Sequence, residues 1–118
     1  MDVKSAGKMA LDSIEDCLKK FPKSKLCHET SSYFYLQVAP KWIDRGKRSL
    51  DFLKSYYAPK LNETVERGFV FYYVQTKQQE LAKTAVTTFM KNFPNSSYTE
   101  EMKFFSNALQ NPIRSKEK

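Results

Sequence analysis

The chain has little of several residue types on which common functional sites depend. Its 118 residues include only 3 glycines, 2 cysteines and 1 histidine. Three scattered glycines exclude a glycine-rich phosphate-binding loop, and a single histidine argues against a conventional zinc site. It also leaves few groups for general acid–base catalysis. We therefore expect no metal, no cofactor and no enzymatic activity.

Long apolar runs are missing as well. The longest, at residues 69–74, is far shorter than the roughly 20 residues that cross a bilayer. The first residues also lack the apolar stretch of a signal peptide. No membrane span is expected. If the sequence is complete as given, the expected location is the cytoplasm; if it is a fragment of an exported protein, the location is the periplasm or cell envelope.

Apolar and basic residues, in contrast, are plentiful. The hydrophobic fraction is 41% and the aromatic fraction 14%, so the composition is that of a folded chain rather than a disordered one. There are 20 lysines and arginines against 13 acidic residues, which gives a net charge of +7. A basic domain of this kind favours an acidic partner.

A thirteen-residue pattern occurs twice, at residues 10–22 and 82–94. The matching positions are Ala10, Ile14, Cys17 and Pro22 in the first copy and Ala82, Val86, Phe89 and Pro94 in the second. The copies are 72 residues apart. Halfway between them lies a third, weaker copy that contains Gly46, Leu50, Leu53 and Tyr57. A constant period of this length is typical of repeat architectures.

Each copy predicts an amphipathic helix, because its apolar residues recur at spacings of three and four. Proline disfavours helical geometry in the residue before it, so these helices should end near Pro22, Pro59 and Pro94. The segments that follow are also periodic, and their predicted N-caps are Ser24, Asn62 and Ser96 or Ser97. Two helices therefore alternate along the chain, with short connections at residues 39–42 and 75–78.

The repeated spacing of small residue, aliphatic residue and proline resembles the second helix of tetratricopeptide repeats. The turns at residues 21–26 and 93–98 resemble those of a subgroup found in bacterial outer-membrane-assembly lipoproteins. This resemblance implies an all-α fold of antiparallel helix hairpins stacked as a short right-handed solenoid. The implied single domain spans residues 1–111, as a half repeat (1–24), two repeats (about 25–60 and 61–96) and a final helix (97–111). Residues 112–118 are expected to form a charged, flexible tail.

Stacked helix pairs of this kind expose a concave surface that can hold a peptide or a partner helix. The resemblance thus implies a protein-interaction scaffold, as part of a larger assembly, that binds an acidic protein or peptide. The aromatic and apolar residues either pack between helices or line the groove. The predicted partner-binding residues are Tyr33, Leu36, Phe69, Tyr72, Tyr73 and Phe105, with Lys41, Arg45 and Arg48 at the rim.

Two alternatives to a peptide-binding scaffold remain. Basic residues gather at residues 19–25 and 41–48, which would suit a helical nucleic-acid-binding domain. Alternatively, the chain is a structural section of a larger envelope or secretion complex and self-associates through its terminal helices.

Cys17 and Cys27 lie on either side of the turn at Pro22. In a reducing compartment both would be small core residues, whereas in an exported protein they would be able to form a disulfide. The sequence leaves both possibilities open. His28 lies beside Cys27 and Glu29 but lacks the other ligands of a metal site, and we expect it to be an exposed imidazole.

Overall fold

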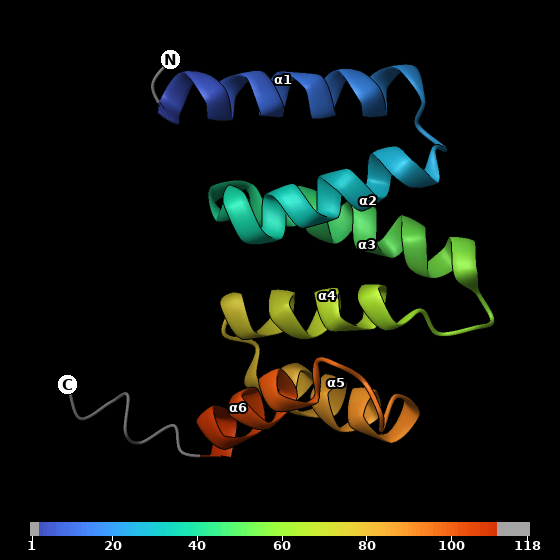
Figure 1. The fold of residues 1–118 in the computed structure, drawn as a ribbon, viewed down its shortest axis with the longest axis vertical. Coiled ribbons are helices and arrows are strands. Elements are labelled where there is room, and N and C mark those ends of the chain that lie inside the picture. Colours follow the sequence, from blue (N-terminus) through green and yellow to red (C-terminus); the bar gives the residue numbers. More distant parts are fainter. Residues whose placement is uncertain (1–2, 111–118) are drawn as a thin grey trace. The chain divides into compact units, whose positions relative to one another are not determined.

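The computed structural model describes residues 3–110, and every regular element in that range is a helix (Figure 1). The α-helices are α1 (Val3–Lys20), α2 (Lys25–Tyr33), α3 (Ile43–Tyr57), α4 (Glu63–Gln75), α5 (Gln79–Asn92) and α6 (Thr99–Gln110). The predicted all-α fold is confirmed. None of these helices has the length and apolarity needed to cross a bilayer. The predicted tail at 112–118 lies outside the described residues.

The helix ends follow the predicted proline pattern. α1, α3 and α5 end at Lys20, Tyr57 and Asn92, each two residues before a proline. In all three, the amide of the residue between helix and proline still donates to the carbonyl four positions back, over 2.8–3.0 Å. The proline then ends the helix, because it has no amide hydrogen to continue the ladder.

Two of the predicted N-caps are also present. The Ser24 hydroxyl accepts a hydrogen bond from the Cys27 amide at 3.2 Å, and the Asn62 side chain accepts one from the Val65 amide at 3.0 Å. Ser96 lies in the turn before α6, where its hydroxyl accepts from the Tyr98 amide at 3.0 Å. These side chains satisfy amides that have no partner inside their helix.

The chain divides into two compact units, Met1–Pro59 and Lys60–Lys118. The predicted boundary between two repeats, at about residue 60, stays a prediction. Within each unit the chain reverses direction at every short connection (Figure 1). The stacking of these helices as a right-handed solenoid stays a prediction.

In the first unit, α2 continues into the π-helix η1 (Phe34–Val38), which is followed by the short 3-10 helix η2 (Pro40–Trp42) and then by α3. Ile14, Phe34 and Tyr35 form the buried centre of a cluster that joins α1 to η1. Gly46 of α3 lies against η1, and a Cβ atom at that position would be only 3.1 Å from the Tyr35 Cβ. The small residue at this point of the repeat therefore permits close packing of two helical segments.

In the second unit, α5 packs against both α4 and α6. The core is apolar and consists of Val70, Ala82, Val86, Phe89, Met102 and Leu109. At the surface of this unit, the Arg67 guanidinium of α4 donates two hydrogen bonds to the Glu101 carboxylate of α6, at 2.8 and 2.7 Å. A bidentate pair of this kind fixes the relative orientation of the two helices.

Candidate functional site

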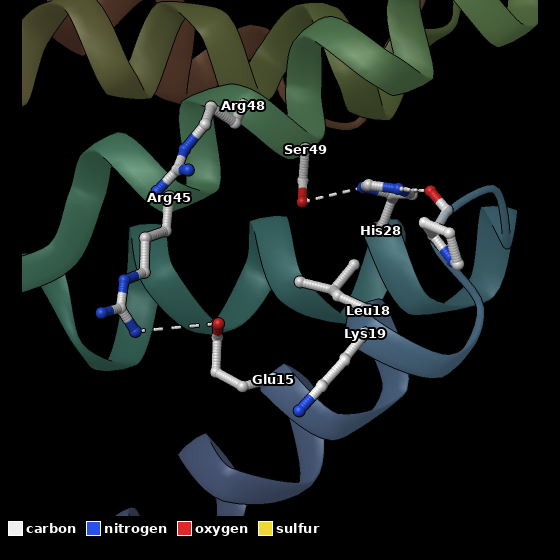
Figure 2. A pocket seen from close by; sticks show the side chains of 8 residues that line it. Glu15, Leu18, Lys19, His28, Arg45, Arg48 and Ser49 are labelled. Atoms are coloured by element: carbon white, nitrogen blue, oxygen red, sulfur yellow. Dashed lines mark hydrogen bonds and ion pairs between the residues drawn. The ribbon is translucent and has the colours of Figure 1, made fainter.

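A cavity of about 350 Å³ opens in the first unit between α1 and α3. Figure 2 shows the α1 side chains on one side of it, the α3 side chains on the other, and His28 of α2 at one end. We call it the basic cavity. Its lining residues are Glu15, Leu18, Lys19, Pro22, His28, Arg45, Arg48 and Ser49.

The charges around the basic cavity do not balance. The single carboxylate, Glu15, lies 3.7 Å from the Arg45 guanidinium. Lys19 and Arg48 form no ion pair with any of the described residues. An anionic group that enters the cavity would therefore meet two positive charges that the protein itself leaves uncompensated.

Arg45 is held in place by its neighbours. It donates a hydrogen bond to the Tyr35 hydroxyl at 3.3 Å, and that hydroxyl donates to the Glu15 carboxylate. The guanidinium carbon also lies 5.6 Å from the centres of the Tyr35 and Trp42 rings, within the range of cation–π attraction. The hydrogen bond to Tyr35 raises the pKa of Arg45, and burial is the main cause of the raised pKa of Tyr35. At neutral pH Arg45 is charged and Tyr35 is neutral.

His28 is not the exposed imidazole that the sequence led us to expect. Its ring is half-buried and stacks on Phe52, with the ring centres 3.9 Å apart. The Nε2 atom donates to the Pro22 carbonyl at 2.7 Å, and Nδ1 lies 3.0 Å from the Ser49 hydroxyl, which is hydrogen-bonded in turn to Ser31. The expectation was wrong because it depended on the neighbours of His28 in sequence, whereas the packing of α2 on α3 decides its environment.

The two cysteines form a disulfide, which decides between the alternatives that the sequence left open. Cys17 of α1 and Cys27 of α2 are joined with a Cα–Cα distance of 5.8 Å. Their sequence neighbours Leu18 and His28 line the basic cavity. The bond therefore ties together two of the helices that form the cavity walls.

The described residues offer little for a metal ion. Both cysteines are in the disulfide, so neither is a thiolate ligand while that bond is intact. Both ring nitrogens of His28 lie within hydrogen-bond distance of protein groups. Within residues 3–110 no three or more His, Cys, Asp or Glu side chains cluster in a way that would hold a metal.

Of the predicted partner-binding residues, two line the basic cavity. Arg45 and Arg48 both line the basic cavity, but Lys41 does not; its ammonium lies 5.3 Å from the centre of the Trp42 ring. Of the predicted aromatic and apolar residues, Tyr33 is exposed, Leu36, Phe69 and Tyr72 are buried, and Tyr73 and Phe105 are partly buried against the core of the second unit. That any of them contacts a partner stays a prediction.

Most residues of the basic cavity were not predicted from the sequence. Glu15, Leu18 and Lys19 are spaced three and four apart, so they share one face of α1, and this signal is present in the sequence. No comparable signal places His28 beside Ser49, because those residues meet only through the packing of α2 on α3. The cavity also combines the two basic clusters, with Lys19 from one and Arg45 and Arg48 from the other.

Comparisons of the chain with protein-family models, with curated proteins and with solved structures find no match. The resemblance to tetratricopeptide repeats therefore depends on the sequence pattern, and membership in that family stays a prediction.

Proposed function

We propose that the protein is a helical protein-binding module that holds an acidic side chain of its partner in the basic cavity. The observation that carries this proposal is the presence of Lys19 and Arg48, neither in an ion pair with any described residue, at the edge of one cavity. A carboxylate is the complementary group for both cations. An arginine can also bind a carboxylate through two parallel hydrogen bonds.

The size of the basic cavity favours one or two side chains as its occupant. Small-ligand pockets span roughly 300–1,000 Å³, and a volume of about 350 Å³ is at the lower end of that range. A nucleic-acid strand would instead need a basic surface that follows several phosphates. We therefore do not propose nucleic-acid binding, but the binding test can detect it.

The surroundings of the cavity suit the recognition of a partner. Its walls are held by the Arg45–Tyr35–Glu15 contacts, the His28 hydrogen bonds and the disulfide, so a partner would bind a preformed site. Tyr33 is 63% exposed and remains accessible as an aromatic anchor for the same partner. We further propose that the module is one section of a larger assembly, and that other helical repeats in this assembly extend the binding surface.

The disulfide bears on where this binding takes place. Disulfides persist in oxidising compartments and are rare in the cytosol. The Cys17–Cys27 bond therefore favours a location in the periplasm or cell envelope over one in the cytoplasm.

The test selects binders from a random peptide library against the intact, oxidised protein and measures the affinity of the best peptide. The informative variant is Lys19→Gln/Arg48→Gln. The matched control, Lys60→Gln/Lys91→Gln, removes the same charge from two exposed lysines of the second unit. We expect enrichment of Asp- and Glu-containing peptides, a loss of at least about tenfold in the cavity variant and less than about twofold in the control.

Three results would contradict the proposal. Equal losses of affinity in both variants would mean that only net charge matters, and selection of peptides without acidic residues would mean that the cavity does not hold an acidic side chain. Tighter binding to single-stranded DNA than to any peptide, with a steep decrease as salt rises, would favour the nucleic-acid alternative.

A further inference from the structure

The turn between α1 and α2 carries two exposed apolar side chains. Phe21 is 61% exposed and Leu26 is 70% exposed. Residues 19–26 also contain four lysines and no acidic residue. We call Phe21, Leu26, Lys19, Lys20, Lys23 and Lys25 the apolar–basic tip. Neither Phe21 nor Leu26 lines the basic cavity, and of the tip residues Lys19 alone does.

In the second unit, the apolar residues at the corresponding repeat positions are partly buried. Phe93 and Tyr98 occupy the positions that correspond to Phe21 and Leu26, and both pack against the core of their unit. In the first unit the turn is closed by the disulfide instead, and the two apolar side chains face solvent. Exposed apolar residues that the fold itself does not need are typical of interaction surfaces.

The backbone of the tip is well held. The Ser24 amide donates to the Phe21 carbonyl at 3.0 Å, and the Ser24 side chain caps α2. His28 donates to the Pro22 carbonyl, and the disulfide closes the base of the turn. Because this segment is already ordered, binding through it would cost little conformational entropy.

The lysines of the tip are accessible to an anionic surface. Lys19 and Lys23 form no ion pair with any described residue. Lys20 lies 3.2 Å from Asp16 and Lys25 lies 3.6 Å from Glu29, but these are solvent-exposed pairs between neighbouring helical turns. Exposed pairs of this kind contribute little energy, so they would exchange readily for a lipid phosphate.

We propose that the apolar–basic tip docks on the surface of an anionic lipid bilayer. Phe21 and Leu26 would enter the boundary between headgroups and acyl chains, while the lysines remain at the level of the lipid phosphates. A flat anionic surface suits exposed apolar side chains that have cations close by in the sequence, because it can bind both and needs no groove. This inference goes beyond the proposed function, and only Lys19 belongs to both surfaces.

The experiment measures co-sedimentation of the intact, disulfide-bonded protein with vesicles of phosphatidylcholine, with and without roughly 30% phosphatidylserine. We expect binding to the anionic vesicles alone, with a decrease as salt rises. Phe21→Ser/Leu26→Ser should lower partitioning at least about tenfold. Its matched control, Leu81→Ser/Phe104→Ser, changes two exposed apolar residues of the second unit and should lower partitioning less than about twofold.

The lysines are tested with Lys20→Gln/Lys23→Gln, which leaves the basic cavity intact. We expect a loss of about tenfold on anionic vesicles, against about twofold for Lys60→Gln/Lys91→Gln. Circular dichroism checks that each variant is folded, and its mass checks that the disulfide is intact. Peptide binding by the Phe21→Ser/Leu26→Ser variant should be unchanged, so failure of this inference is distinguishable from failure of the proposed function.

Several results would overturn the inference. They are the absence of vesicle binding, equal binding to vesicles with and without phosphatidylserine, and equal losses in the tip variant and its control. If the tip variant is instead a monomer where the parent protein is a dimer by analytical ultracentrifugation, the tip contacts a second copy of the chain and not a lipid surface.

Discussion

The two units have the same kind of helices but are held together by different interactions. The first unit contains a disulfide and, beside its apolar core, the buried serines Ser31 and Ser49, which are hydrogen-bonded to each other and connect to His28. The core cluster of the second unit is entirely apolar. The same helical pattern in the sequence is therefore stabilised in two ways, by a disulfide in the first unit and by apolar packing in the second.

The difference is clearest at one pair of corresponding positions. Cys17 and Phe89 occupy the same place in the repeated pattern. Cys17 is bonded to Cys27, whereas Phe89 is 1% exposed, with the Phe93 ring centre 5.1 Å from its own. A covalent bond in one unit thus takes the place of aromatic packing in the other. This exchange also leaves Phe21 exposed where Phe93 is packed.

The largest effect is expected from removing the aromatic packing of the second unit. Phe89→Ala should lower the free energy of unfolding by about 3–5 kcal/mol, because it leaves a cavity in a closely packed core. Hydrogen exchange should show lost protection in α4–α6. The control Phe104→Ala, at a residue 68% exposed, should cost less than about 0.5 kcal/mol. Equal loss of protection in both units would mean that they unfold together.

The next largest effect is expected from the disulfide. Cys17→Ser/Cys27→Ser should lower the free energy of unfolding by roughly 2–4 kcal/mol, because the unfolded chain is no longer constrained. The loss should be confined to α1–α3 in hydrogen exchange, and reduction of the parent protein should reproduce it. If the second unit loses protection from hydrogen exchange to the same extent, the disulfide does not stabilise the first unit alone, and the proposed difference between the two units is wrong.

A smaller effect is expected from the hydrogen bonds of the Tyr35 hydroxyl in the first unit. Tyr35→Phe keeps the ring but removes the hydrogen bonds to Glu15 and Arg45, at a cost of about 0.5–1.5 kcal/mol at neutral pH. The control Tyr56→Phe, at an exposed tyrosine of the same unit, should cost less than about 0.5 kcal/mol.

Tyr35 also predicts a dependence on pH. Burial raises its pKa in the folded state above the ordinary value of 10.0, so its contribution to stability is complete below that pH and is lost as the pH rises further. The stability difference between the parent protein and Tyr35→Phe, measured by urea unfolding, should therefore shrink above pH 10. A difference that stays constant or grows would contradict the burial of a neutral phenol.

Much of the fold was predictable because it depends on local interactions. The prolines, the caps at Ser24 and Asn62 and the apolar spacing act within a few residues of chain, and the structure has the helices where these signals place them. The π-helix at Phe34–Val38 was not predicted, since its periodicity over five residues is not distinguishable from that of an α-helix. Of the candidate site, only Arg45 and Arg48 were predicted as binding residues.

The sequence by itself determined that this protein is helical, basic and built on a recurring pattern, because periodicity, charge and proline positions act locally or add along the chain. Only the tertiary structure decided that Cys17 bonds to Cys27, that His28 stacks on Phe52, and that cations from two separate clusters line one cavity. These outcomes depend on distances between residues far apart in sequence, and such distances are set by the packing of whole helices.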